Sequence, residues 1–132
     1  MSIAALLHNK RVCVCAGSGG VGKTTTSAVI ALGMAAEGKK VAVVTIDPAR
    51  RLANALGLEE LQNTPHQVEP ERLASAGLEL RGELWAMMLD PKRTFDELIE
   101  RLAPSQERAE EIKQNRVYRE LSTAVSGSQV SL

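Results

Sequence analysis

A glycine-rich loop constrains this chain more than any other feature. Residues 17–25 read GSGGVGKTT and lie between a strand-like run, residues 11–16 (RVCVCA), and a helix-like run, residues 24–37. The backbone N–H groups of such a loop point inward, and the N-terminus of the following helix adds partial positive charge. Lys23 can reach the outer phosphates of a ligand, and the Thr24 hydroxyl can ligate Mg²⁺. The predicted ligand is a nucleoside triphosphate.

The same loop also satisfies the dinucleotide-binding pattern GxGxxG, through Gly17, Gly19 and Gly22. Asp47 follows the next strand-like run, where a dinucleotide-binding fold places its ribose-binding acid. The lysine and threonine directly after Gly22 distinguish the two alternatives, because a triphosphate loop needs both and a dinucleotide loop needs neither. Triphosphate binding is therefore favoured, and dinucleotide binding is the alternative.

Alternating strand-like and helix-like segments predict an α/β fold. The helix after the loop ends at Gly38, and residues 41–46 (VAVVTI) form a β-branched run typical of a buried parallel strand. Another strand is expected at residues 83–89 (ELWAMML), and a helix at residues 92–102. Strand, loop, helix and strand make a βαβ unit. The expected architecture is a parallel sheet flanked by helices.

The remaining segments carry weaker signals. We expect a short helix at residues 49–58, loop with a little helix at residues 59–82, and a longer amphipathic helical segment from Pro104 to Val125. The predicted organisation is a tail (residues 1–10), a nucleotide-binding core (residues 11–91) and a helical segment (residues 92–132). Doubly wound sheets usually carry five or more strands, so the few strands here predict an incomplete sheet in the N-terminal part of a longer protein.

Composition excludes two classes of partner. Sixteen basic and sixteen acidic side chains cancel, which removes the long-range attraction to nucleic acid or to anionic membrane surfaces. The apolar patch Ile3 to Leu7 is too short for a signal-peptide core, and no run has the length needed to cross a bilayer. We therefore expect a cytoplasmic protein without nucleic-acid binding or direct membrane insertion.

The two cysteines have a structural interpretation. Cys13 and Cys15 fall within the first predicted strand, and we expect both to be small buried apolar side chains.

Two aspartates that precede prolines can act at the site or cap a helix. Asp47 ends a strand beside the loop, so it could orient the water that attacks the γ-phosphate, or it could cap a helix that begins at Pro48. Asp90 has the same Asp-Pro context without the neighbouring loop, and capping is favoured there.

The stretch GSGGVGKTTTSAVIALGMAAEGKKVAVVTIDPARRLANALG, residues 17–57, resembles the N-terminal segment of the ArsA family of ATPases. This family includes arsenite-pump ATPases and factors that target tail-anchored proteins. LWAMMLDP, residues 84–91, is similar to the third strand of that family and its Asp-Pro end. The resemblance implies a P-loop fold of the deviant Walker A class, ATP and Mg²⁺ as ligands, and a nucleotide-sandwich dimer, with a second copy or with a related ATPase subunit.

The resemblance also implies roles for individual residues. Lys23 would contact phosphate, Thr24 would ligate Mg²⁺, Thr25 would help to bind the α-phosphate and Asp47 would activate the catalytic water. The nucleotide-binding residues would be Gly17, Ser18, Gly19, Gly20, Val21, Gly22, Lys23, Thr24 and Thr25. The deviant loop normally carries a signature lysine directly after its first glycine, and this chain has Ser18 at that position.

The leading hypothesis is an enzyme that binds and hydrolyses MgATP. The alternative is a nucleotide-gated binding or targeting protein with little turnover, whose client would be another protein. The segment from Pro104 to Val125 corresponds to the start of the region where targeting members of the family bind apolar cargo, although core packing explains its pattern equally well. Nothing in the sequence matches the second switch of the family. Because the outer strands are missing, one edge of the sheet would be unpaired and the apolar helices partly uncovered, so we expect weak or absent ATPase activity for these 132 residues alone.

Overall fold

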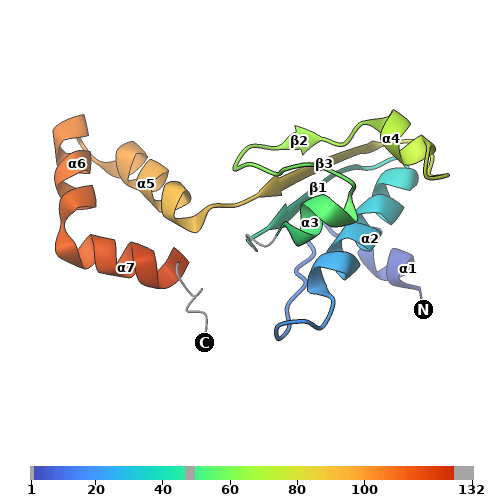
Figure 1. Ribbon diagram of the computed structural model, residues 1–132, viewed down its shortest axis with the longest axis horizontal. Coiled ribbons are helices and arrows are strands. Elements are labelled where there is room, and N and C mark those ends of the chain that lie inside the picture. The colour runs from blue at the N-terminus through green and yellow to red at the C-terminus, as the bar shows by residue number, and fades with distance from the viewer. Residues whose placement is uncertain (1, 47–49, 127–132) are drawn as a thin grey trace. The chain divides into compact units, whose positions relative to one another are not determined.

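The computed structural model describes residues 2–46 and 50–126 and divides into two compact units, Met1–Met88 and Leu89–Leu132. The first unit is an α/β unit, and the second contains helices (Figure 1). The elements of the first unit, in chain order, are α1 (Ile3–Leu7), α2 (Lys23–Ala36), β1 (Lys40–Thr45), α3 (Arg51–Ala55), β2 (His66–Gln67), α4 (Pro70–Ala74) and β3 (Glu83–Met88).

The sheet has the strand order β1-β3-β2. β1 and β3 are parallel and in register from Lys40 opposite Glu83 to Thr45 opposite Met88, whereas the short β2 pairs antiparallel with β3. The predicted α/β fold and the strands at residues 41–46 and 83–89 are thus confirmed within one or two residues. The sheet is mixed rather than purely parallel, because β2 pairs antiparallel with β3. β2 lies within residues 59–82, which were expected to be loop with a little helix.

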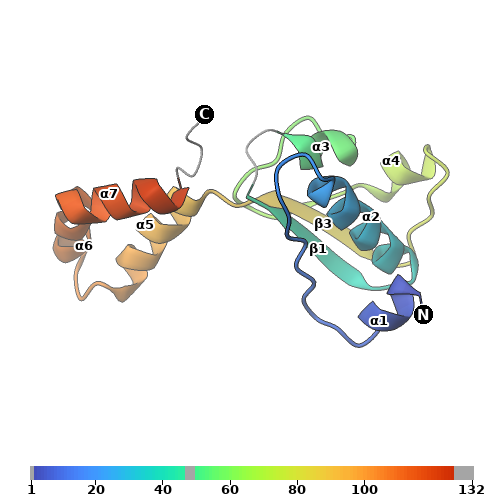
Figure 2. The ribbon, with the colours of Figure 1, turned by 90° about the horizontal axis from the view of Figure 1, so that it is seen from below.

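Helix α2 connects the phosphate loop to β1, and its C-terminus has a Schellman motif. Gly38 has a left-handed backbone with φ of 99°, its N–H donates to Ala35 O, and the Lys39 N–H donates to Met34 O. Because only a short turn separates α2 from β1, the two elements run in opposite directions (Figure 2). The loop at the start of α2 and the carboxyl end of β1 therefore lie at the same end of the sheet.

The core of the first unit lies between α2, α3 and the sheet. It is built from small and aliphatic side chains, as the scarcity of aromatic residues predicts, and Leu52, Leu84 and Val68 are the largest that are fully buried. The cluster comprises Ala28, Ala31, Ala35, Val43, Leu52, Ala53, Leu56, Leu61, Val68, Leu73, Leu84 and Ala86. This core fixes α2, and with it the phosphate loop, against the sheet.

The strand predicted at residues 11–16 is not formed in the structure. This segment is irregular, and Val12 and Val14 are 79% and 81% exposed. Cys13 is exposed and Cys15 is partly exposed, so the expectation that both cysteines are buried is also wrong. The physical reason is that an alternating apolar run becomes a strand only when a neighbour pairs with its backbone, and the segment is not paired with β1.

Gly82 is packed so closely against the turn before β1 that a larger residue does not fit. A Cβ at this position would overlap Lys39 O and lie 2.6 Å from the carbonyl carbon of Gly38. These are backbone atoms, held by hydrogen bonds from Gly82 N to Ala35 O and from Glu83 N to Lys39 O. We expect Gly82→Ala to lower the free energy of unfolding by about 2 kcal/mol, measured by urea denaturation.

Gly33 provides the matched control for this substitution. It lies within α2, and nothing lies within 4 Å of the position its Cβ would take. Gly33→Ala is expected to raise the free energy of unfolding by about 0.5–1 kcal/mol through helix propensity. Equal effects of the two substitutions would show that the contact at Gly82 is not as the structure has it.

The second unit contains α5 (Pro91–Leu102), α6 (Gln106–Gln114) and α7 (Arg116–Ser126). Asp90 caps α5, since its Oδ1 accepts from Arg93 N at 3.1 Å, as its Asp-Pro context predicts. The single helical segment expected from Pro104 to Val125 is instead two helices. Asn115 separates them, because its backbone leaves the helical conformation and its Oδ1 accepts from Val117 N at 2.9 Å.

Tyr118 joins α7 to α5 and gives this unit a spectroscopic probe. Its hydroxyl donates to Asp96 Oδ1 at 2.8 Å, and partial burial together with this acceptor raises the pKa of Tyr118 to about 12. Because the pKa of the folded state lies above the unfolded value, this contribution to stability is present below about pH 10 and is lost as the pH rises through 12. Tyr118 is the only tyrosine, so its phenolate absorbance is unambiguous. We expect Asp96→Asn to lower its titration midpoint toward that of free tyrosine; an unchanged midpoint would contradict the contact.

None of the helices within residues 2–46 and 50–126 combines the length and the apolar character that a transmembrane span requires.

Candidate functional site

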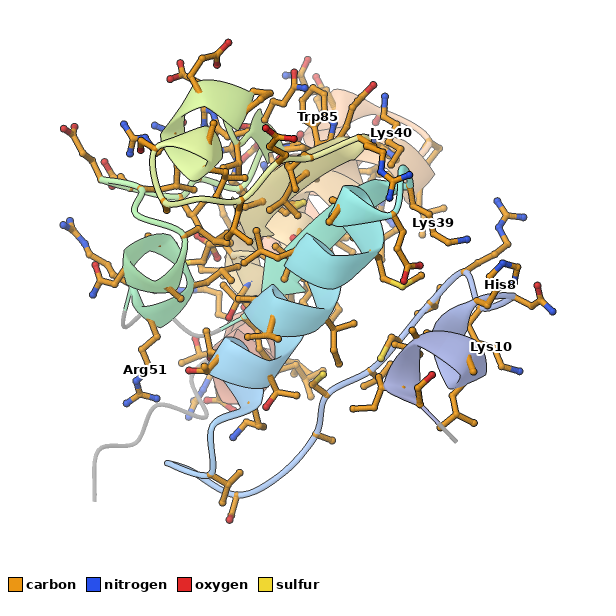
Figure 3. All side chains as sticks on the ribbon, turned by 90° about the vertical axis from the view of Figure 1, so that its right-hand side faces the viewer. His8, Lys10, Lys39, Lys40, Arg51 and Trp85 are labelled. Atoms are coloured by element: carbon orange, nitrogen blue, oxygen red, sulfur yellow. The ribbon has the colours of Figure 1, made fainter. Side chains whose placement is uncertain are left out.

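The loop at residues 17–22 takes a conformation that only glycine adopts readily. Gly20 and Gly22 have φ of 75° and 89°, in the left-handed region. Gly22 is the residue immediately before the first turn of α2, so its conformation directs the chain into the helix. Figure 3 shows the loop, drawn in blue, leading into the lower end of this helix. At Gly17 the loop passes close to itself, because a Cβ there would approach Val21 Cγ2 to 2.9 Å. The backbone conformation therefore favours glycine at Gly20 and Gly22, whereas Gly19 has neither a positive φ nor an atom within 4 Å of its Cβ position.

The electrostatics at the start of α2 favour an anion. The first turn of α2 holds Lys23 and contains no acidic residue, so nothing on the helix neutralises its positive end. The Lys23 Nζ folds back over the loop and donates to Ser18 O at 2.7 Å. This contact holds the ammonium group beside the loop.

The two threonines that follow Lys23 belong to the first turn of α2. Thr24 is partly buried and Thr25 is exposed. The helix behind them is held by the Ser27 hydroxyl, which donates to Lys23 O at 2.8 Å. Both threonines lie on α2, which packs on the sheet through Ala28, Ala31 and Ala35.

The structure brings together the residues predicted for the loop, from Gly17 to Thr25, and leaves one predicted residue untested. Asp47 lies outside the described residues. β1 ends at Thr45, at the end of the sheet where the loop also lies. The proximity of a carboxylate to the loop therefore stays a prediction.

Arg50 has an unusual backbone conformation and lines a cavity. Its backbone is left-handed, with φ of 55°, and it is the only non-glycine residue with positive φ among the described residues. It lines a cavity of about 220 Å³ at the carboxyl ends of β1 and β3, together with Thr45, Glu60 and Met88. From the sequence alone, an arginine on a short helix is either solvated or in contact with phosphate or a partner subunit.

A metal ion at this site would depend on the nucleotide. Within the described residues, no group of three or more His, Cys, Asp or Glu side chains is arranged to hold a metal ion. Mg²⁺ commonly binds through one or two protein ligands and the phosphates of a substrate. The Thr24 hydroxyl, beside the glycine-rich loop, fits this mode.

Comparison with known proteins identifies one family model and several relatives that match this chain. The family model for anion-transporting ATPases (ArsA ATPase) matches residues 10–123. The chain is 33% identical over 88 residues to the ATPase GET3 of Malassezia globosa, a match that covers 65% of this chain and 23% of the relative. It is 46% identical over 50 residues to the putative arsenical pump-driving ATPase 1 of Aquifex aeolicus, covering 38% of this chain and 13% of the relative.

A further relative is the septum site-determining protein MinD of Helicobacter pylori, which is 51% identical over 49 residues, covering 36% of this chain and 18% of that protein. The chain thus spans less than a quarter of the length of each of these curated relatives.

Proposed function

Because the chain belongs to the ArsA family of ATPases, we propose that it binds MgATP on the loop of residues 17–25 and supplies the nucleotide-binding part of an ATP hydrolase. The observation that carries this proposal is the loop geometry. Left-handed Gly20 and Gly22 lead into a helix whose first turn is cationic and free of acidic residues. Such a helix start binds phosphate through its amides and its dipole.

In the proposed reaction the loop stabilises charge and a carboxylate positions water. The Lys23 ammonium leaves Ser18 O for the β- and γ-phosphate oxygens, where it and the loop amides stabilise the charge that develops during phosphoryl transfer. The Thr24 hydroxyl would hold Mg²⁺, which supplies neutralisation of the phosphate oxygens when bound. Asp47 accepts a hydrogen bond from the attacking water and orients it toward the γ-phosphorus.

A nucleotide-gated binding protein is the second candidate function, and one residue favours it. Ser18 occupies the position of the signature lysine of the deviant loop, so this chain offers no lysine there to a nucleotide across a dimer interface. In such a protein, ATP occupancy would change the contacts between subunits, and hydrolysis would be slow. A dinucleotide-binding domain is the least favoured candidate, since it gives Lys23 and Thr24 no role.

The partners follow from the same proposal. We propose a cytoplasmic protein that acts as a homodimer or as a dimer with a related ATPase subunit and that handles a protein client. The second unit is consistent with a client role, because Leu102, Val117 and Leu121 on its helices are exposed. Core packing against further polypeptide would explain the same exposure.

Substitution of Thr24 by valine tests the site. Thr24→Val keeps the shape of the side chain and removes the hydroxyl that would ligate Mg²⁺. We expect the affinity for ATP in the presence of Mg²⁺ to fall about 10-fold, while the affinity measured in EDTA stays unchanged. Isothermal titration calorimetry with and without Mg²⁺ measures both values.

Thr26→Val is the matched control, since Thr26 is an exposed threonine on the same helix, after the loop motif. Its affinities should equal those of the unaltered chain. If Thr24→Val left the magnesium dependence intact, Thr24 would not be the ligand.

A further inference from the structure

Basic side chains gather at the end of the first unit where β1 and β3 begin. They come from three stretches that are distant in the sequence: the segment after α1, the turn from α2 into β1, and the turn before β3. Residues 1–40 contain five basic side chains and one acidic side chain, Glu37. We use the name basic surface for the residues Lys10, Arg11, Lys39, Lys40 and Arg81.

Contacts between these stretches hold the basic surface together. The Lys39 Nζ donates to His8 O at 3.1 Å and so joins the end of α1 to the turn before β1. Arg81 lies beside the same turn, because a Cβ on Gly38 would lie 3.9 Å from Arg81 Cβ. Figure 3 shows His8 and Lys39 on the same side of the unit as Lys10. Segments that are 30 residues or more apart in the sequence thus contribute to one surface.

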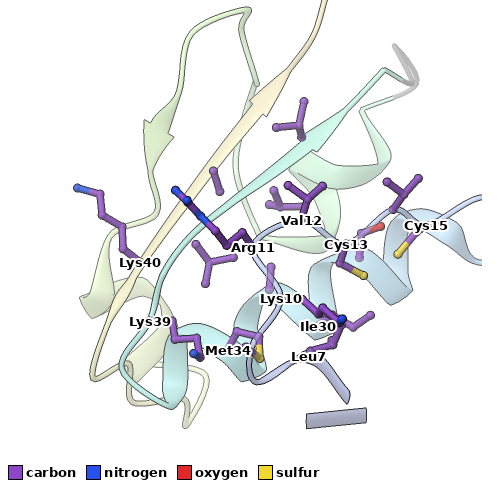
Figure 4. Close-up of a pocket in the computed structure, with 17 residues that line it drawn as sticks. Leu7, Lys10, Arg11, Val12, Cys13, Cys15, Ile30, Met34, Lys39 and Lys40 are labelled. Carbon is purple, nitrogen blue, oxygen red and sulfur yellow. The ribbon is translucent and has the colours of Figure 1, made fainter. Parts of the chain in front are cut away.

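Little acidic charge neutralises the basic surface. Within residues 2–46 and 50–126, Glu83 is the one carboxylate that forms an ion pair with it, through the Lys40 Nζ at 3.1 Å. The Lys40 side chain is still 70% exposed, and Lys10 and Arg11 are also exposed. Arg11 lines one end of a cavity together with Lys39 and Lys40 (Figure 4). Positive charge is therefore concentrated locally, although the charges of the whole chain cancel.

Helix α1 adds apolar side chains next to the basic surface. Ile3 and Leu6 are 63% and 54% exposed, whereas Leu7 lines the cavity of Figure 4 together with Ile30 of α2. Leu7 thus holds α1 near α2, while Ile3 and Leu6 face solvent. Exposed aliphatic side chains on a helix next to Lys and Arg are typical of a segment that lies at a membrane interface.

We propose that α1 and the basic surface bind the surface of an anionic membrane. Ile3 and Leu6 enter the boundary between the lipid headgroups and the acyl chains, and the basic side chains contact the anionic headgroups. The charges are complementary, and each Lys or Arg near such a membrane strengthens binding about 5-fold. An acidic polypeptide would satisfy the cations alone, whereas a bilayer also takes up the apolar side chains of α1.

This mode of binding leaves the phosphate loop accessible. α2 begins at the loop and ends at the turn that carries Lys39, and its 14 residues span about 20 Å. A bilayer that contacts the basic surface therefore lies at the end of the unit opposite the loop. Vesicle binding and nucleotide binding involve opposite ends of the unit, so either can fail without the other.

Flotation of the 132-residue chain with lipid vesicles tests this proposal. One set of vesicles contains phosphatidylcholine alone, and the other also contains phosphatidylserine. We expect at least about 10-fold stronger binding to the vesicles with phosphatidylserine. The difference should disappear in about 1 M salt, where the Debye length falls to about 3 Å.

A charge variant tests the basic surface. Replacement of both Lys10 and Arg11 by glutamine removes two exposed cations, so binding to vesicles with phosphatidylserine should fall at least about 10-fold. The matched control replaces Lys92 and Arg93 by glutamine. These are exposed cations on α5 that already have acidic partners, and their replacement should leave vesicle binding unchanged.

An apolar variant tests α1. Leu6→Gln should weaken binding to vesicles with phosphatidylserine at least about 5-fold, because an amide gains little from the acyl boundary. Leu121→Gln is the matched control, since Leu121 is an exposed leucine of α7, and vesicle binding should not change. Circular dichroism checks that both variants are folded.

Three results would overturn the proposal. The first is equal binding to the two kinds of vesicle, or binding to neither. The second is vesicle binding that Leu6→Gln leaves intact, which would remove α1 from the surface. The third is binding of polyglutamate as tight as that of the anionic vesicles and lost in the Lys10 and Arg11 variant, which would identify an acidic polypeptide as the partner.

Discussion

Substitution of Asp47 by asparagine is expected to reduce single-turnover phosphate release by at least about 100-fold. In the proposed reaction the carboxylate accepts a hydrogen bond from the attacking water and helps to remove its proton, and an amide of the same shape does neither well. Nucleotide binding depends on the loop instead, so the affinity of Asp47→Asn for MgATP should stay within about twofold of the unaltered value. The measurement requires the full-length protein, because these 132 residues are expected to turn over slowly or not at all.

Asp90→Asn is the matched control for this substitution. Asp90 also precedes a proline at the end of a strand, but it caps α5 through its contact with Arg93 N. Asparagine is an equally good cap, so Asp90→Asn should leave both phosphate release and stability unchanged. Unimpaired release by Asp47→Asn would remove Asp47 from the mechanism. A full-length protein that releases no phosphate in any oligomeric state would favour the nucleotide gate.

Substitution of Lys23 by alanine is expected to weaken MgATP binding by at least about 100-fold, which corresponds to about 2.7 kcal/mol. Lys23 is the cation in the first turn of α2, and its ammonium already lies beside the loop at Ser18 O. Its removal leaves the outer phosphates with the backbone amides and the magnesium ion, without a cationic side chain from the first turn of α2. Calorimetric titration with MgATP gives the affinity, and circular dichroism shows whether α2 remains folded.

Two further variants make this result specific. Lys23→Arg keeps the charge but replaces a compact ammonium group with a larger planar one, so binding should be only partly restored. Lys92→Ala removes an exposed lysine that pairs with Asp96 on α5, and binding should not change. If Lys23→Ala bound MgATP as tightly as the unaltered chain, the loop would not be the phosphate site.

The sequence was sufficient to predict the parts of the fold that depend on local chemistry. Helix α2 and its end at Gly38 follow from an apolar run that a glycine terminates in a Schellman motif. The paired strands β1 and β3 follow from apolar runs bounded by turns. The cap at Asp90 follows from the Asp-Pro dipeptide. In the glycine-rich loop, left-handed backbones occur at two of the glycines, Gly20 and Gly22, and only Gly22 belongs to the GxGxxG pattern.

The errors arose where a structure depends on neighbours that are distant in the sequence. Residues 11–16 have the side-chain pattern of a strand, but pairing requires a partner that local sequence cannot specify. β2 has only two residues, and its pairing with β3 overrides a polar, turn-rich stretch. The division between α6 and α7 does have a local cause at Asn115, which helical periodicity alone does not reveal because the apolar residues continue in phase across it.

Calorimetric titration of the folded chain with MgATP, and separately with NAD, tests the central claim most directly. The loop from Gly17 to Thr25 should give saturable binding of MgATP that weakens when Mg²⁺ is removed, and it should give no heat with NAD. Binding of NAD alone, or no binding of magnesium nucleotide by a chain whose circular dichroism shows it to be folded, would contradict the account.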